Sequence, residues 1–174
     1  METAIVSIIC IALVVFGGMT MSQGFLTSVD TTTVSLKEIG QASEDIMRTQ
    51  LSLDSVYTSV GGLNLYVTLN NTGQTKLSNF SKWDVIIQYY DDEDNYRTVW
   101  LPYTATNPPG NNQWTVYWIY YGSDPATYEP GIFNPGERMR IRAQLNPDIG
   151  NDTINMVVIS TPNGVPIPVQ FEGP

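Results

Sequence analysis

The pattern of apolar positions divides the chain near residue 60. No residue from Thr3 to Val29 is charged, and the stretch from Ala4 to Phe16 is almost entirely apolar. Extended to Met21, the apolar segment is about 18–20 residues long, which is enough to cross a bilayer. Because it is apolar on all sides, it has to be buried on all sides, by lipid or by copies of itself.

A sparser pattern follows, in which apolar residues recur at helical spacing on an otherwise polar segment. These residues are Leu36, Ile39, Ile46, Leu53 and Val56. No proline occurs before residue 60, and Gly61-Gly62 follows directly, so the spacing predicts one long helix, or two in series, over residues 1–60. A single helix over residues 2–58 would measure about 85 Å and would need neighbours at its side.

After Gly62 the period of the pattern changes to two, and all 11 prolines and all 4 tryptophans occur in this half. Alternation and turn residues predict seven strands. We place them at residues 63–70, 83–89, 96–101, 113–121, 137–145, 154–160 and 165–171. Pro166 and Pro168 put the last strand at a sheet edge. The expected fold is α+β, with a long N-terminal helix (1–60) followed by an immunoglobulin-like antiparallel β-sandwich (61–174).

Composition argues against catalysis, metal binding and nucleic-acid binding. The chain has no histidine, a single cysteine (Cys10) and a net charge of −9, from 8 basic and 17 acidic residues. We therefore predict no enzyme, no catalytic residue, no cofactor, no metal and no nucleic-acid partner. The acidic run Asp91–Asp94 fits a solvated turn better than a calcium loop. The aromatic residues between Trp114 and Tyr121 fit core and subunit packing better than a sugar platform.

Three Asn-x-Ser/Thr sequons lie in the second half, at Asn70, Asn79 and Asn151. Each is short and common by chance, but all three fall in or beside predicted turns. We therefore expect N-linked glycans at these positions, on a weakly charged surface rich in Asn and Thr.

Together these features resemble an archaellin, the subunit of the archaeal rotary filament, which is related to type IV pilins. The resemblance rests on the uncharged helix Ala4–Phe16, on its extension to Gly61-Gly62, and on two turns of the sandwich, Asn70–Gly73 and Asn134–Glu137. It covers the whole chain.

The resemblance implies a secreted filament subunit used for swimming, whose precursor carries a short basic leader that a prepilin-type peptidase removes. The helices would leave the membrane, with the help of the filament's export and motor machinery, and pack as the core of a homopolymer outside the cell. We expect this polymerisation core to include Glu2, Ile5, Ile8, Ile9, Leu13 and Phe16. The β domains would form the outer, glycosylated wall.

Two alternatives remain open from the sequence. One is an adhesive pilin of the same superfamily, and the other is a membrane-anchored stator or surface-layer-binding protein, since the accessory proteins of the archaellum motor share the helix-plus-sandwich plan. The long apolar stripe favours a filament subunit, because a monomeric anchor does not need one.

Overall fold

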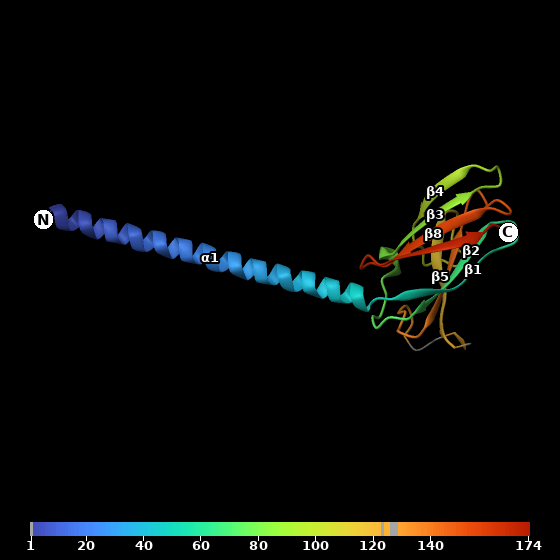
Figure 1. Cartoon of the computed structure of the whole chain (residues 1–174), viewed down its shortest axis with the longest axis horizontal. Helices are drawn as coiled ribbons and strands as arrows, with labels where there is room; N and C mark the ends of the chain where they lie inside the picture. Colours follow the sequence, from blue (N-terminus) through green and yellow to red (C-terminus); the bar gives the residue numbers. More distant parts are fainter. Residues whose placement is uncertain (1, 123, 126–128) are drawn as a thin grey trace. The chain divides into compact units, whose positions relative to one another are not determined.

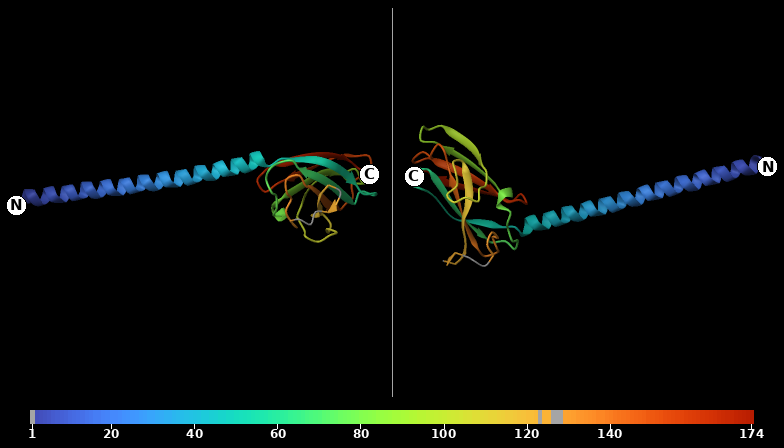
Figure 2. Two further views of the ribbon diagram at one scale, coloured as in Figure 1. Left: turned by 90° about the horizontal axis from the view of Figure 1, so that it is seen from below. Right: turned by 180° about the vertical axis from the view of Figure 1, so that it is seen from behind.

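The computed structural model describes residues 2–122, 124–125 and 129–174, and it divides into two units at Glu44/Asp45. The first unit is helical. Helix α1 (Glu2–Arg48) has 47 residues and no break, as Figures 1 and 2 show. At 1.5 Å per residue it is about 70 Å long. Its last turn, Asp45–Arg48, belongs to the second unit, which we call the β domain.

The β domain contains two antiparallel sheets that form a sandwich (Figure 1). The five-stranded sheet has the order β1-β2-β7-β5-β6, and the four-stranded sheet has the order β4-β3-β8-β9. The strands are β1 (Leu51–Thr58), β2 (Asn64–Asn71), β3 (Asp84–Tyr90), β4 (Tyr96–Leu101), β5 (Gln113–Tyr121), β6 (Asp124–Pro125), β7 (Arg138–Gln144), β8 (Ile154–Ser160) and β9 (Pro166–Glu172). A short 3₁₀ helix, η1 (Phe80–Lys82), precedes β3.

The core lies between the two sheets and is made by alternate residues of each strand. Leu65, Val67 and Leu69 of β2 face Val85 and Ile87 of β3 across it, and all are buried. This confirms the predicted antiparallel sandwich, with its seven sequence-derived strands within a residue or two of their observed ends. Strand β9 is an edge strand, as its prolines require.

The predicted extent of the helix is wrong. The helix ends at Arg48, and residues 51–58 form β1, so the predicted division at residue 60 falls inside the sandwich. The cause is an irregularity in the pairing of β1 with β2 between Leu53 and Ser55. A bulge there inserts one residue and reverses the alternation, so that Leu51 and Val56 both pack against the core. The spacing from Leu53 to Val56 then imitates a helical i, i+3 pair.

Candidate assembly surfaces

The N-terminal part of α1 exposes its apolar side chains all round. The described members of the predicted polymerisation core are Ile5, Ile8, Ile9, Leu13 and Phe16, and they are 53–69% exposed. Burying a side chain of this size stabilises by about 1.5–3 kcal/mol, so these five represent about 10 kcal/mol that a single copy in water does not gain. Glu2 is the first residue of α1, and its side chain lies outside the described part of the chain.

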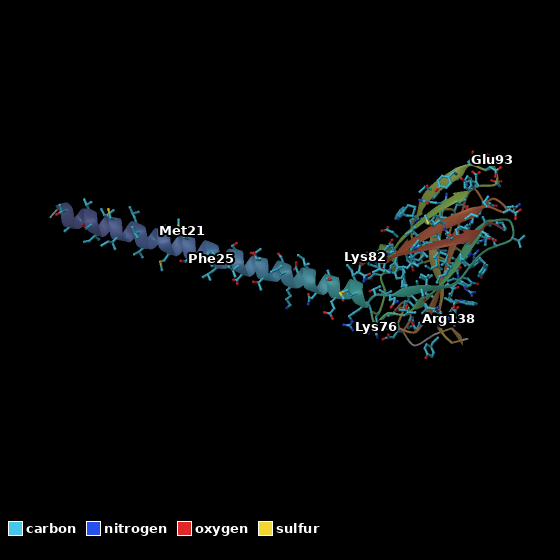
Figure 3. The ribbon with its side chains drawn as sticks, viewed as in Figure 1. Met21, Phe25, Lys76, Lys82, Glu93 and Arg138 are labelled. Carbon is cyan, nitrogen blue, oxygen red and sulfur yellow. The ribbon has the colours of Figure 1, made fainter. Side chains whose placement is uncertain are left out.

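The apolar surface continues beyond these positions. Met21 and Phe25 project freely from α1 in Figure 3 and are 80% and 70% exposed. Among the described residues, α1 is the one helix long and apolar enough to cross a membrane. A helix with this surface needs apolar surroundings along much of its length.

The hydroxyl groups on α1 do not prevent such burial. Ser7 and Thr27 each donate a hydrogen bond to the carbonyl four residues earlier, at 2.9 and 3.0 Å. Thr31, Thr32 and Thr33 do the same. A hydroxyl bonded back to its own helix can enter lipid or a helix bundle without leaving a donor unpaired. The threonine-rich segment is part of the continuous helix α1, although threonine is a poor helix former.

The C-terminal end of α1 is fixed to the β domain by hydrogen bonds. The Gln74 amide donates to the Arg48 carbonyl at 2.8 Å, and Asn163 Nδ2 donates to Thr49 Oγ1 at 2.7 Å. Gly73 allows this close approach, because a Cβ there would lie 2.5 Å from the Arg48 carbonyl oxygen. The turns after β2 and β8 therefore supply partners for the carbonyl end of the helix.

The outward face of the five-stranded sheet carries three of the eight basic residues of the chain, all on β7. We call it the arginine face, and it consists of Arg138, Arg140, Arg142, Tyr57, Tyr66, Tyr117 and Trp118. The guanidinium groups of Arg140 and Arg142 lie 5.8 Å from the ring centroids of Tyr57 and Tyr66. These contacts stabilise the orientation of both guanidinium groups.

The charges on the arginine face are only partly neutralised. Arg138 Nε lies 3.8 Å from Asp54 Oδ1. Arg140 donates to Thr68 Oγ1 and Arg142 to Asn64 Oδ1, and neither forms an ion pair with a described residue. Alternation along β7 places the three arginines on one side of the strand, but which strands flank them depends on the sheet order.

The acidic run is a tight turn between β3 and β4. We call Asp91–Asn95 the acidic turn. Asp91 is buried and accepts hydrogen bonds from Arg97 and Asn95 and from the Glu93 amide. Desolvation acts to raise the pKa of Asp91, but these hydrogen bonds outweigh it and lower the pKa from 3.8 to about 2. The Asp91 carboxylate is thus engaged inside the turn, and no group of three or more acidic or cysteine residues that could hold a metal ion occurs among the described residues.

The aromatic residues of β5 divide between the core and the surface. Trp114 is fully buried, whereas Trp118 and Tyr121 are 48% and 71% exposed. Tyr117 stacks on Trp118 with ring centroids 4.7 Å apart. Trp114 therefore completes the core, whereas Trp118 and Tyr121 lie on the outer surface.

The three sequons differ in their surroundings. Asn79 and Asn151 are exposed, at the start of η1 and in the turn before β8. Asn70 borders a turn as expected, but it is the second-last residue of β2 and is half-buried, between Ser52 of β1 and Arg138 of β7. Sequence could not show this, because the neighbouring strand β1 was hidden by its bulge.

Comparison with known proteins gives one family. The sequence model of the archaeal-type flagellin family matches residues 1–171. No curated protein matches the chain.

Solved structures support the fold. The archaeal flagellum of Methanospirillum hungatei strain JF1 matches with a TM-score of 0.58 and 15% identity, over 95% of this chain and 90% of that one. Flagellin FlaB1 of Methanocaldococcus jannaschii matches with a TM-score of 0.52 and 15% identity, over 72% and 90%. The archaellum periplasmic stator protein FlaG of Sulfolobus acidocaldarius matches with a TM-score of 0.50 and 21% identity, over 71% and 99%. Each likeness shows a shared fold.

Proposed function

We propose that this chain, which belongs to the archaeal-type flagellin family, polymerises through the apolar side chains of α1 after passing through the membrane. Family membership makes the protein a structural subunit of the archaellum, the extracellular helical filament used for swimming. In that filament the helices pack in the core and the β domains lie at the surface. Beyond family membership, we propose which residues of α1 drive assembly and that membrane insertion of α1 comes before it.

One observation carries the proposal. The segment around Ile5, Ile9 and Leu13 is apolar on every side and exposed in the single chain, whereas the β domain has its own closed core. Because α1 is not needed to complete that core, its apolar surface is free for other copies. A bundle of parallel helices satisfies it along the full length of the segment.

Substitution in α1 tests this directly. We expect Ile9→Asp and Leu13→Asp to abolish filaments, because a charge inside an apolar bundle costs several kcal/mol in every subunit. Val60→Asp is the matched control, since Val60 is fully exposed in the turn after β1. Electron microscopy of sheared cell-surface material measures the outcome. Normal filaments from either α1 variant would refute the assignment of the core.

We further propose that α1 is inserted in the membrane before assembly, and that the export and motor machinery of the filament takes it from there. The uncharged segment from Thr3 to Val29 is long enough to cross the hydrocarbon core, which is about 30 Å thick. Subunits in a strain that cannot assemble filaments should therefore resist alkaline carbonate extraction. Release by carbonate would contradict a membrane-inserted precursor.

Glycosylation is proposed at Asn79 and Asn151, whose exposure makes them accessible to a transferase. Asn70 is a third candidate, although its neighbours in the sheet leave less room around it. Peptide mass spectrometry of filaments from the native host tests each site. Unmodified peptides covering all three would rule the proposal out.

The stator remains the second candidate function, favoured by the likeness to FlaG over 99% of that chain. The structural match to FlaG covers 71% of this chain, whereas the match to the Methanospirillum hungatei flagellum covers 95% of it. Mechanical shearing of cells separates the two functions. A filament subunit is recovered in the sheared fraction, and a stator stays with the membranes.

A further inference from the structure

The outward face of the four-stranded sheet carries exposed aromatic and apolar side chains in two groups, which the polar pair Gln88 and Thr98 separates. Pairing between strands places Trp100 of β4 beside Ile86 of β3, and Ile86 beside Val158 of β8. The second group contains Tyr90 and Tyr96, whose rings lie 5.2 Å apart. We call this surface the aromatic face, and it consists of Ile86, Tyr90, Tyr96, Trp100, Met156 and Val158.

The aromatic face is unusual for a solvated sheet. Trp100 is 57% exposed, and Tyr96 is exposed to the same degree. Large exposed apolar side chains that gather on one face, as Ile86, Trp100, Tyr90 and Tyr96 do, are typical of a protein–protein interaction surface. The acidic turn lies at one end of this face, because it joins Tyr90 of β3 to Tyr96 of β4. Asp92, Glu93 and Asp94 of the turn are exposed and form no ion pair with a described residue.

The arginine face has the complementary composition. It presents the guanidinium groups of Arg140 and Arg142, which form no ion pair with a described residue, beside exposed aromatic rings. Trp118 lies next to Arg140 in the pairing of β5 with β7. Guanidinium groups bind both carboxylates and aromatic rings well, so this surface suits one that offers both.

The two surfaces cannot meet within one copy. They are the outward faces of opposite sheets of the sandwich. Figure 3 shows Glu93 of the acidic turn and Arg138 of the arginine face far apart on the β domain. A contact between them therefore requires two chains.

We infer that the aromatic face and acidic turn of one subunit bind the arginine face of a neighbouring subunit in the filament. This inference rests on the proposed function and concerns the outer wall, not the helical core. Such an interface joins two different surfaces of the same chain. Repetition of a contact of this kind produces an open helical polymer rather than a closed dimer.

Charge indicates that the partner of these two surfaces is a second copy of the same chain. The chain has a net charge of −9, so most of its surface repels another copy, and the arginine face is the concentrated exception. An anionic lipid surface would suit the arginine face alone, and it would leave the aromatic face, with its acidic turn, without a partner. A second copy supplies both the carboxylates for the arginines and the rings for the aromatic face.

Tryptophan accessibility provides the first test, because the four tryptophans divide evenly. Trp83 and Trp114 are buried in the core, while Trp100 and Trp118 lie one on each proposed surface. In detergent-solubilised full-length subunits, acrylamide should quench the two exposed tryptophans. On assembly we expect the quenching constant to fall toward that of the two buried residues. The double variant Trp100→Phe/Trp118→Phe should show no such fall, and each single variant should show part of it.

Charge exchange provides the second test. We expect Arg140→Glu/Arg142→Glu, and separately Asp92→Lys/Glu93→Lys, to speed the loss of subunits from filaments by about tenfold or more, because like charges would then face each other. All four changes in one chain restore opposite charges at every contact and should recover most of the loss. Lys82→Glu is the control, since Lys82 is exposed on η1, away from both surfaces. Near-UV circular dichroism of solubilised subunits checks that each variant folds.

The outcomes separate this inference from the function on which it rests. Filaments in which Trp100 or Trp118 stays as accessible as in the subunit would overturn the inference and leave the helical core intact. Loss of stability in folded one-sided variants without recovery in the combined variant would also overturn it. Failure of the proposed function would instead appear as the absence of filaments from the unaltered protein.

Discussion

Two shortened proteins test where the β domain begins. Residues 45–174 keep the last turn of α1 and strand β1, whereas residues 61–174 lack both. We expect the longer protein to be soluble, folded and mainly β, and to form no filaments, because it lacks the apolar helix. We expect the shorter one to be clearly less stable.

The magnitude follows from the contacts of β1. Leu51 and Val56 are each partly buried against the core, and half-burying two such side chains stabilises by about 2 kcal/mol. Tyr57 stacks on Tyr66 with centroids 4.9 Å apart, which adds about 1 kcal/mol. A loss of about 3 kcal/mol is a large share of the 5–15 kcal/mol that stabilises a typical domain. It lowers the melting temperature by about 10 °C in a domain of this size.

Thermal melts followed by circular dichroism, with sedimentation to detect aggregates, measure this difference. Equal melting temperatures for the two proteins would refute the reasoning, since β1 would then contribute nothing to the sandwich. An unfolded longer protein would show that α1 completes the core. Filaments from the longer protein would show that the β domains, not the helices, hold the polymer together.

The remaining predictions concern three single residues. Gly73→Ala should destabilise the β domain by about 2 kcal/mol, because the added Cβ would displace the backbone hydrogen bonds to Arg48 and Gln50. A denaturant titration measures this, with Gly110→Ala as the control, because the Cβ added there would contact only a flexible side chain. The pKa of Asp91 is lowered to about 2, so its stabilising effect is complete above about pH 4 and is lost as the pH falls toward 2; melting temperatures from pH 5 to 2 should fall more steeply for the native protein than for Asp91→Asn. Glu2→Gln should slow filament assembly without changing the melting temperature of the β domain, because a carboxylate in the first turn of α1 interacts with the helix dipole; an unchanged assembly rate would limit Glu2 to a flank of the apolar segment.

Much of the fold could be predicted because it follows from local patterns. The uncharged run after Glu2 has one physical outcome, a helix buried on all sides. Strands such as Asp84–Tyr90 and Ile154–Ser160 were placed within one residue of their observed ends, since alternation reports directly on which side of a sheet a residue lies.

Strand β1 could not be predicted because its signal is not local. One extra residue near Asp54 breaks the alternation, and the resulting spacing is that of a helix. What makes residues 51–58 a strand is the free edge of β2, which only the folded sandwich provides. The end of α1 depends in the same way on Gly73 and Asn163, which are remote in sequence.

The candidate assembly surfaces, too, could be predicted only in part from the sequence. The sequence by itself determined that α1 must be covered by lipid or by other copies, because no arrangement of a single helix can bury an apolar surface on every side. It also placed the three arginines of β7 on one face of a strand. Only the tertiary structure decided that Tyr57, Tyr66 and Trp118 flank them, and that the aromatic face and acidic turn lie on the opposite sheet. The physical reason is that side-chain alternation fixes the face of each strand, whereas the neighbours of a strand are chosen by the packing of the whole sandwich.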